Sequence, residues 1–186
     1  MIEKKHSLKT ELAYFANLKV LTCAALMVAL SIICGKLLAF NVGTFLRFSF
    51  ENMPILLTSI AFGPFIGAIT GGLADLIGCL IVGYEINPIV TVGAILIGLV
   101  GGLVYRLLYR LPEIVKIICS VLISHIIGSV VIKTFGLSAF YELPFELLIL
   151  WRLLNYSIIS ILEILLLWYL LKSRAVRNQL EKLKVR

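Results

Sequence analysis

Residues 63–83 read GPFIGAITGGLADLIGCLIVG, and this stretch decides the fold class. An α-helix needs about 20 apolar residues to cross the hydrocarbon core of a bilayer, and this stretch supplies them with one charged residue, Asp75. The apolar run is continuous, whereas strands of a membrane β-barrel alternate between apolar and polar residues over about ten positions. The stretch therefore predicts a helix that spans a membrane.

The whole chain has the same character. Of its 186 residues, 61% are hydrophobic and 15% are charged, and the mean hydropathy is +1.07. Soluble domains are about 45–50% apolar and about 25% charged, so an ordinary soluble enzyme and a disordered chain are both excluded. The length leaves no room for a separate soluble domain beside the apolar segments, so we predict a single membrane domain over residues 1–186.

The apolar segments are separated by short stretches rich in turn-forming residues. They predict an all-α integral membrane protein, a bundle of six transmembrane helices. The expected spans are residues 18–40, 45–62, 63–83, 88–108, 114–135 and 145–171. The second span is the least regular, because Arg47, Glu51 and Pro54 interrupt its start.

Basic residues mark one side of the membrane. Of the 17 Lys and Arg residues, 13 lie before or at the start of the first span, around the loop between the fourth and fifth spans, or after the sixth span. Basic loops face the cytoplasm in membrane proteins, so we predict that both termini are cytoplasmic. The basic tail over residues 172–186 has two interpretations, a surface that lies on anionic membrane lipid or a simple stop signal for insertion.

The other four cations lie near the outer ends of spans, together with acidic and amide side chains. Charged groups within spans cost several kcal/mol if they face lipid, so their usual place is the bundle interior or a cavity. We therefore predict a polar pocket that opens outward. The candidate substrate-binding residues are Lys36, Arg47, Asp75, Tyr84, Asn87, Lys133, Arg152 and Asn155.

Each of these residues also has a purely structural interpretation. Arg47 can pair with Glu51 four residues later, and Asp75 can be a carboxylate that only joins neighbouring helices. Lys36 and Lys133 can extend to the membrane surface as snorkelling side chains.

Arg152 and Asn155 are three residues apart, which places both on one helix face. There the guanidinium can hold a carboxylate in bidentate fashion, and the amide can bind the polar edge of a ring. The alternative is that Arg152 is an anchor at the membrane interface beside Trp151.

Small residues recur every four positions in three of the spans. They are Gly63, Gly67 and Gly71 in the third span, Gly98 and Gly102 in the fourth, and Ala25 and Ala29 in the first. Such faces let helix backbones approach closely, either within the chain or against another membrane subunit.

Catalytic and metal-binding patterns are absent from the sequence. It contains no zinc-protease, nucleophile-elbow or phosphate-loop motif, and its four cysteines are scattered without metal-ligand spacing. We expect no enzyme activity, no cofactor, no metal and no nucleic-acid partner. Two other hypotheses remain, a small stand-alone channel or secondary carrier with a proton relay through Asp75 and His125, and an intramembrane enzyme that also uses Glu163.

Three short sequences point to a family. They are FENMPI at residues 50–55, FGPFIGA at residues 62–68 and GGLADLIG at residues 71–78. Together with the six spans and the A-x-x-x-A pattern, they resemble the substrate-binding S components of energy-coupling factor (ECF) transporters, most of all the folate family.

This resemblance implies a function and a set of partners. S components bind a vitamin from outside a bacterial plasma membrane and associate with a transmembrane coupling protein and two ATPases, which move the substrate inward. The A-x-x-x-A helix is the family's coupling surface, which gives Ala25 and Ala29 a partner-binding role. The transport scheme of the family has the whole S component topple within the membrane.

Folate fits the predicted charges, since its glutamate carries two carboxylates and the outer end holds four cations. The pterin ring offers donors and acceptors to Asp75 or Asn155, between aromatic rings such as Phe48, Tyr84 or Trp151. The loops 41–45 and 83–88 are expected to cap the pocket. Other vitamins or small metabolites remain alternative substrates, because S components for uncharged vitamins share the same motifs.

Overall fold

The computed structural model describes residues 14–42 and 46–184. Its helices are α2 (Leu18–Ile32), α3 (Asn52–Phe62), α4 (Pro64–Val82), α5 (Pro88–Leu107), α6 (Glu113–Ser124), α7 (Lys133–Tyr141), α8 (Phe145–Lys172) and α9 (Arg174–Lys184). Two π-helical segments, η1 (Ile33–Leu37) and η2 (His125–Ile132), continue α2 and join α6 to α7. Two short strands, β1 (Phe40–Val42) and β2 (Leu46–Phe48), form an antiparallel hairpin.

The helical membrane class is confirmed. Five helices within the described residues are long and apolar enough to cross a membrane, counting α2 with η1 and α6 with η2 and α7 as one helix each. The second expected span corresponds to α3, which is apolar but shorter. The fifth expected span, residues 114–135, runs on to Tyr141.

The hairpin is a correction to the all-α prediction. The first helix ends at Leu37 rather than residue 40, and β2 lies within the stretch predicted as the start of the second span. The phenyl rings of Phe40 and Phe48 stack with their centroids 5.5 Å apart, which closes the open end of the pair. The chain then enters α3 with Pro54 in the first turn, where its missing N–H is not needed.

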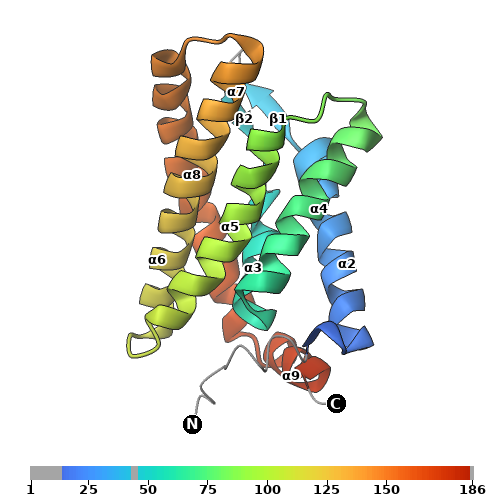
Figure 1. The fold of residues 1–186 in the computed structure, drawn as a ribbon. Coiled ribbons are helices and arrows are strands. Elements are labelled where there is room, and N and C mark those ends of the chain that lie inside the picture. Colours follow the sequence, from blue (N-terminus) through green and yellow to red (C-terminus); the bar gives the residue numbers. More distant parts are fainter. Residues whose placement is uncertain (1–13, 43–45, 185–186) are drawn as a thin grey trace.

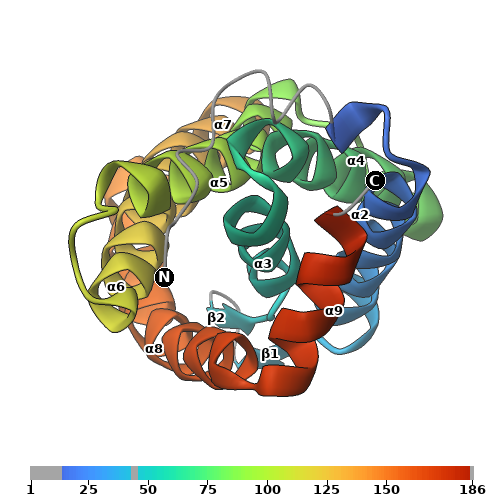
Figure 2. The same ribbon diagram turned by 90° about the horizontal axis from the view of Figure 1, so that it is seen from below.

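The long helices form a ring with α3 in the middle (Figure 2). The hairpin, the α4–α5 turn and the α7–α8 turn lie at the upper end of the bundle in Figure 1, and α9 lies across the lower end. The central position of α3 explains its burial, since Ile55, Leu56 and Phe62 are all nearly inaccessible. The outer faces of the ring carry many exposed leucine and isoleucine side chains, as expected for helices that face lipid.

Glycines hold α4 and α5 close together. A Cβ atom on Gly98 would overlap the carbonyl oxygen of Gly67, and one on Gly71 would overlap that of Ala94. The packing interpretation of these glycines is therefore confirmed. Gly63 has a φ of 110° at the turn between α3 and α4, a backbone conformation that residues other than glycine rarely adopt.

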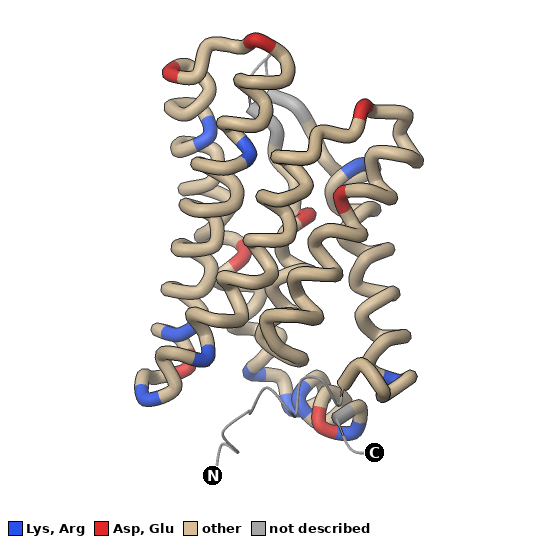
Figure 3. The backbone as a smooth tube through the Cα atoms, viewed as in Figure 1, with Lys and Arg blue, Asp and Glu red and all other residues tan. Residues whose placement is uncertain are grey.

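Charged residues gather in two places (Figure 3). Most of the lysines and arginines lie at the lower end, and a second group of both signs lies within the upper half of the bundle. The cytoplasmic position of the termini stays a prediction, and the second group marks the candidate site.

Candidate functional site

A cavity of about 260 Å³ opens in the upper half of the bundle. Seven of the eight predicted site residues line it, namely Lys36, Asp75, Tyr84, Asn87, Lys133, Arg152 and Asn155. They come from η1, α4, α7, α8 and the α4–α5 turn, so residues far apart in the sequence meet around one space. The backbone of Arg47 lies in β2 opposite Asn41, and its side chain lies outside the described part of the structure.

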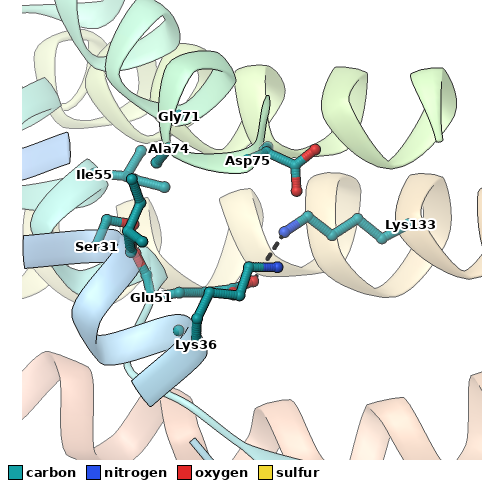
Figure 4. Close-up of a pocket in the computed structure, with 11 residues that line it drawn as sticks. Ser31, Lys36, Glu51, Ile55, Gly71, Ala74, Asp75 and Lys133 are labelled. Carbon is teal, nitrogen blue, oxygen red and sulfur yellow. Dashed lines mark hydrogen bonds and ion pairs between the residues drawn. The ribbon is translucent and has the colours of Figure 1, made fainter. Parts of the chain in front are cut away.

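A smaller chamber of about 20 Å³ adjoins this cavity and has room for about one water molecule. Both spaces are lined by Lys36, Glu51, Asp75 and Lys133. Figure 4 shows the two amines and the two carboxylates pointing toward the same space. Opposite charges from four different segments therefore face one another at the inner wall of the pocket.

The ion pair between Lys133 and Glu51 is the central contact of this group. Lys133 Nζ donates a hydrogen bond of 3.1 Å to Glu51 Oε1, and the lysine residue is only 4% exposed. The snorkelling alternative is therefore wrong for Lys133. Glu51 was not among the predicted site residues, although it lies in the FENMPI motif; its partner stands 82 positions later in the sequence.

Breaking this pair should destabilise the fold. In a Glu51→Gln variant the buried ammonium of Lys133 loses its charged partner, which typically costs about 3–5 kcal/mol for a buried pair. The expected result is a lower thermal unfolding temperature of the purified protein in detergent. Glu85→Gln is the matched control, because Glu85 also lines the cavity but is exposed. Equal unfolding temperatures for the two variants would contradict the structural importance of the pair.

Asp75 is held by the neighbouring helix. Thr91 Oγ1 donates a hydrogen bond of 2.7 Å to Asp75 Oδ2, while Asp75 also lines both cavities. The helix-joining interpretation and the pocket interpretation therefore both describe the observed carboxylate. Its fixed position leaves it able to accept hydrogen bonds from a ligand.

The two pocket lysines are placed by the π-helical segments. Lys36 lies within η1, and Lys133 directly follows η2. A π-helical turn holds one more residue than an α-helical turn and therefore changes the direction of the side chains that follow it, which is why such segments are common at functional sites. Lys36 also lies over the ring of Tyr84, with its Nζ 5.4 Å from the ring centroid.

Two of the three guanidinium nitrogens of Arg152 have no hydrogen-bond partner among the described residues. They are its Nε and one of its terminal nitrogens, and both are buried. Its Cζ lies 5.7 Å from the ring centroid of Tyr156, which lines the same cavity. A guanidinium always carries a charge and prefers planar anions, so this arrangement is suited to a carboxylate ligand.

Asn87 has a structural role in addition to its place at the pocket. Its Oδ1 accepts hydrogen bonds from the backbone N–H groups of Ile89 and Val90 and thereby caps α5. Its Nδ2 donates a bond of 2.8 Å to the carbonyl of Gly136 in α7. The side chain therefore fastens two pocket-forming helices to each other.

A second buried pair lies deeper on the α8 side. His125 Nε2 lies 2.6 Å from Glu163 Oε2, and His125 Nδ1 lies 3.1 Å from Ser129 Oγ. The imidazole packs against Tyr156 with the ring centroids 5.0 Å apart. Both ring nitrogens of His125 therefore have polar partners inside the bundle, and Glu163 is 0% exposed.

Ala25 and Ala29 are exposed on α2, on the side away from the buried Ala24 and Val28. Their small side chains form a shallow strip on the surface of the bundle.

The comparisons with known proteins agree with this architecture. The model of the family described as "ECF transporter, substrate-specific component" matches residues 19–181. The structure of FolT bound with folic acid superposes with a TM-score of 0.66 at 23% identity and covers 80% of this chain and 90% of FolT. The S component of a bacterial ECF transporter superposes with a TM-score of 0.59 at 23% identity, over 83% of this chain and 98% of that one.

No curated protein matches the chain. At 23% identity the two solved structures show a shared fold, and the family model extends over nearly the whole sequence. The chain belongs to the substrate-specific S components of ECF transporters, which are multi-pass proteins of the cell membrane that bind a substrate for transport and are not enzymes.

Proposed function

We propose that this S component captures a folate-like vitamin from outside the cell and delivers it inward together with a transmembrane coupling protein and two ATPases. One observation carries the substrate class: Arg152 lines a cavity of about 260 Å³ and has buried donors without a hydrogen-bond partner among the described residues. Buried guanidinium donors without hydrogen-bond partners are costly, and a carboxylate ligand removes that cost.

The other side of the cavity suits the ring of such a ligand. Asp75 accepts a hydrogen bond from Thr91 and has further acceptor capacity for the donor groups of a pterin. Tyr84 and Tyr156 offer aromatic faces, and Asn155 offers an amide. In this arrangement the ring lies toward Asp75 and the glutamate tail lies toward Arg152, with Lys36 available for the second carboxylate.

The charge balance of the cavity favours a ligand that has both hydrogen-bond donors and an anionic group. Three carboxylates line it, those of Glu51, Asp75 and Glu85, beside three cations, those of Lys36, Lys133 and Arg152. A purely anionic ligand would meet repulsion from the carboxylates. Folate has an amino-substituted ring at one end and carboxylates at the other, and it is also the ligand in the solved FolT structure.

The proposed orientation puts the upper end of Figure 1 outside the cell and the lower end in the cytoplasm. α3 is then a short second span, so that six helices cross the membrane and both termini are cytoplasmic. The concentration of basic residues at the lower end supports this orientation. The hairpin and the α4–α5 turn lie above the cavity, in the position of a cap.

The test is titration calorimetry of the purified chain in detergent with folate, using thiamine, riboflavin and biotin as competitors. Saturable folate binding that the other vitamins do not displace is the expected result. If a different vitamin binds instead, the S-component role stands and the carboxylate argument fails. If none of the four vitamins binds, the proposed substrate class is wrong.

The Ala25–Ala29 strip should be needed for uptake but not for binding. Ala25→Trp places a large ring on this exposed strip, far from the cavity residues, and so blocks close approach of a partner helix. We expect normal vitamin binding by the purified variant and loss of vitamin uptake by cells that express the complete transporter. Val131→Trp is the matched control, because Val131 is 46% exposed on another helix. Unchanged uptake with Ala25→Trp would remove the coupling role from this strip.

A further inference from the structure

The helix α9 is fastened across the lower end of the bundle by its apolar face (Figures 1 and 2). Val176, Leu180 and Leu183 are half-buried. Leu180 packs against two groups of buried core residues, one that includes Leu167 and Leu171 of α8 and one that includes Val20 and Ala24 of α2. Asn17, which caps the start of α2, donates a hydrogen bond of 2.8 Å from its side-chain amide to the carbonyl of Leu183. Hence α9 connects the end of α8 to the beginning of α2.

The opposite face of α9 is basic. At 100° per residue, Arg174 lies opposite the three apolar residues, Arg177 and Lys182 lie on the two flanks of this exposed face, and Glu181 lies between the two arginines. The three basic side chains are exposed. Glu181 is the one acidic residue in the α9 sequence, so the exposed face keeps a net positive charge.

The end of α8 shows at which depth this face lies. Trp168 and Tyr169 are in its last turns, Tyr169 is 71% exposed, and Lys172 Nζ lies 4.5 Å from the Trp168 ring centroid. Tryptophan and tyrosine side chains concentrate at the level of the lipid headgroups. α8 ends at Lys172, a rise of about 6 Å beyond Trp168, and α9 begins two residues later, so the basic face begins at headgroup level.

We propose that the exposed basic face of α9, formed by Arg174, Arg177 and Lys182, binds the phosphate groups of anionic phospholipids. Each lysine or arginine near an anionic membrane surface contributes about a fivefold gain in affinity. Because the apolar face of α9 is used against the bundle, the helix does not insert into the lipid and recognises headgroup charge. The bound lipid would hold the ends of α8 and α2 at the membrane surface.

Tryptophan fluorescence can test this inference without any vitamin. The chain has two tryptophans, so Trp151→Phe leaves Trp168 as the only reporter, close to the start of α9. The protein is reconstituted in phosphatidylcholine vesicles that contain brominated phosphatidylglycerol or brominated phosphatidylcholine, and quenching of Trp168 is compared. We expect phosphatidylglycerol to be preferred at this site by about fivefold or more, with the preference reduced at 1 M salt.

Two double variants show which residues cause the phosphatidylglycerol preference. In Arg174→Gln/Arg177→Gln the preference should fall to about one- to twofold. The control is Arg106→Gln/Arg110→Gln, which removes two positive charges near the α5–α6 loop. In this variant the phosphatidylglycerol preference should be unchanged. Counting the phosphatidylglycerol molecules retained in native mass spectra, with both tryptophans present, gives the same comparison if Trp151→Phe does not fold.

Several results would overturn the proposal. They are the absence of a phosphatidylglycerol preference in the parent, a preference that survives the α9 double variant, or one that only the loop double variant removes. Loss of uptake in the α9 double variant at an unchanged lipid preference would instead assign this face to a protein partner. None of these results depends on the identity of the vitamin.

Discussion

Arg152→Ala should weaken vitamin binding by about 1.5–3 kcal/mol, which is about 10- to 150-fold in the dissociation constant. The guanidinium has buried donors with no hydrogen-bond partner among the described residues, so its bonds to a ligand carboxylate would be new and charge-assisted. Truncation removes these bonds and leaves the carboxylate in a pocket with three acidic side chains. Calorimetric titration of the purified variant with folate measures the loss.

Two comparisons show whether the loss comes from the carboxylate. Arg152→Lys keeps the charge but not the planar pair of donors, so it should recover only part of the affinity. A pterin without a carboxylate should bind the parent and Arg152→Ala equally. Arg47→Ala should weaken folate binding by a similar amount if Arg47 holds the second carboxylate. Normal folate binding by both arginine variants would mean that the proposed pocket is misplaced.

Gly98→Ala should destabilise the fold by about 1–3 kcal/mol, and Gly98→Leu by more. The added Cβ would overlap the backbone carbonyl of Gly67, which cannot move without shifting α4. The shift would also disturb the bond between Thr91 on α5 and Asp75 on α4, so folate affinity should fall together with stability. Thermal unfolding and folate titration of the purified variants in detergent measure both effects.

Gly72→Ala is the control for Gly98→Ala, because it adds the same methyl group between the same two helices. At Gly72 the new Cβ would meet only side-chain atoms of Ile95, at 3.0 Å, and these can move. The unfolding temperature of Gly72→Ala should therefore stay closer to that of the parent. Equal losses in the two variants would show that backbone contact at Gly98 is not what limits the packing.

Much of the fold could be predicted because a membrane imposes simple rules on the sequence. Long apolar runs must be helices in lipid, which identified the helices and their order. The hairpin could not be predicted in this way, because strands as short as Leu46–Phe48 are too brief for a periodic pattern and lie within an otherwise apolar stretch. The π-helical segments also have no signal in composition.

The pocket residues could be predicted for a similar reason. A charge in a span is costly in lipid, so Asp75, Lys133 and Arg152 had to face the interior, and all three line the cavity. The number and position of charged residues in the sequence do not reveal which residue each charged group contacts. The pairing of Lys133 with Glu51, and the contacts of Tyr156 with Arg152 and with His125, depend on how the helices are arranged in space.

Membership of the S-component family also sets aside the two other hypotheses, a stand-alone carrier with a proton relay and an intramembrane enzyme. The structure gives His125 and Glu163 a different use, since they pair with each other and His125 packs against the ring of Tyr156. The presence of a histidine and a glutamate inside the bundle is therefore explained by helix packing.

The pairing of Lys133 with Glu51 and of Glu163 with His125 also bears on how the chain enters the membrane during synthesis. Lys133 in α7 pairs with Glu51, and Glu163 in α8 pairs with His125, so each of these later charges has its partner in a segment that the ribosome has already made. Chains are synthesised from the N-terminus, and a charged side chain in lipid is costly until it is paired. Lys133 and Glu163 can therefore meet their partners as soon as their helices leave the insertion machinery. Glu51 is synthesised 82 residues before its partner Lys133. Its side chain lies beside the hairpin and is 24% exposed, so we expect it to stay in contact with water until Lys133 is in place.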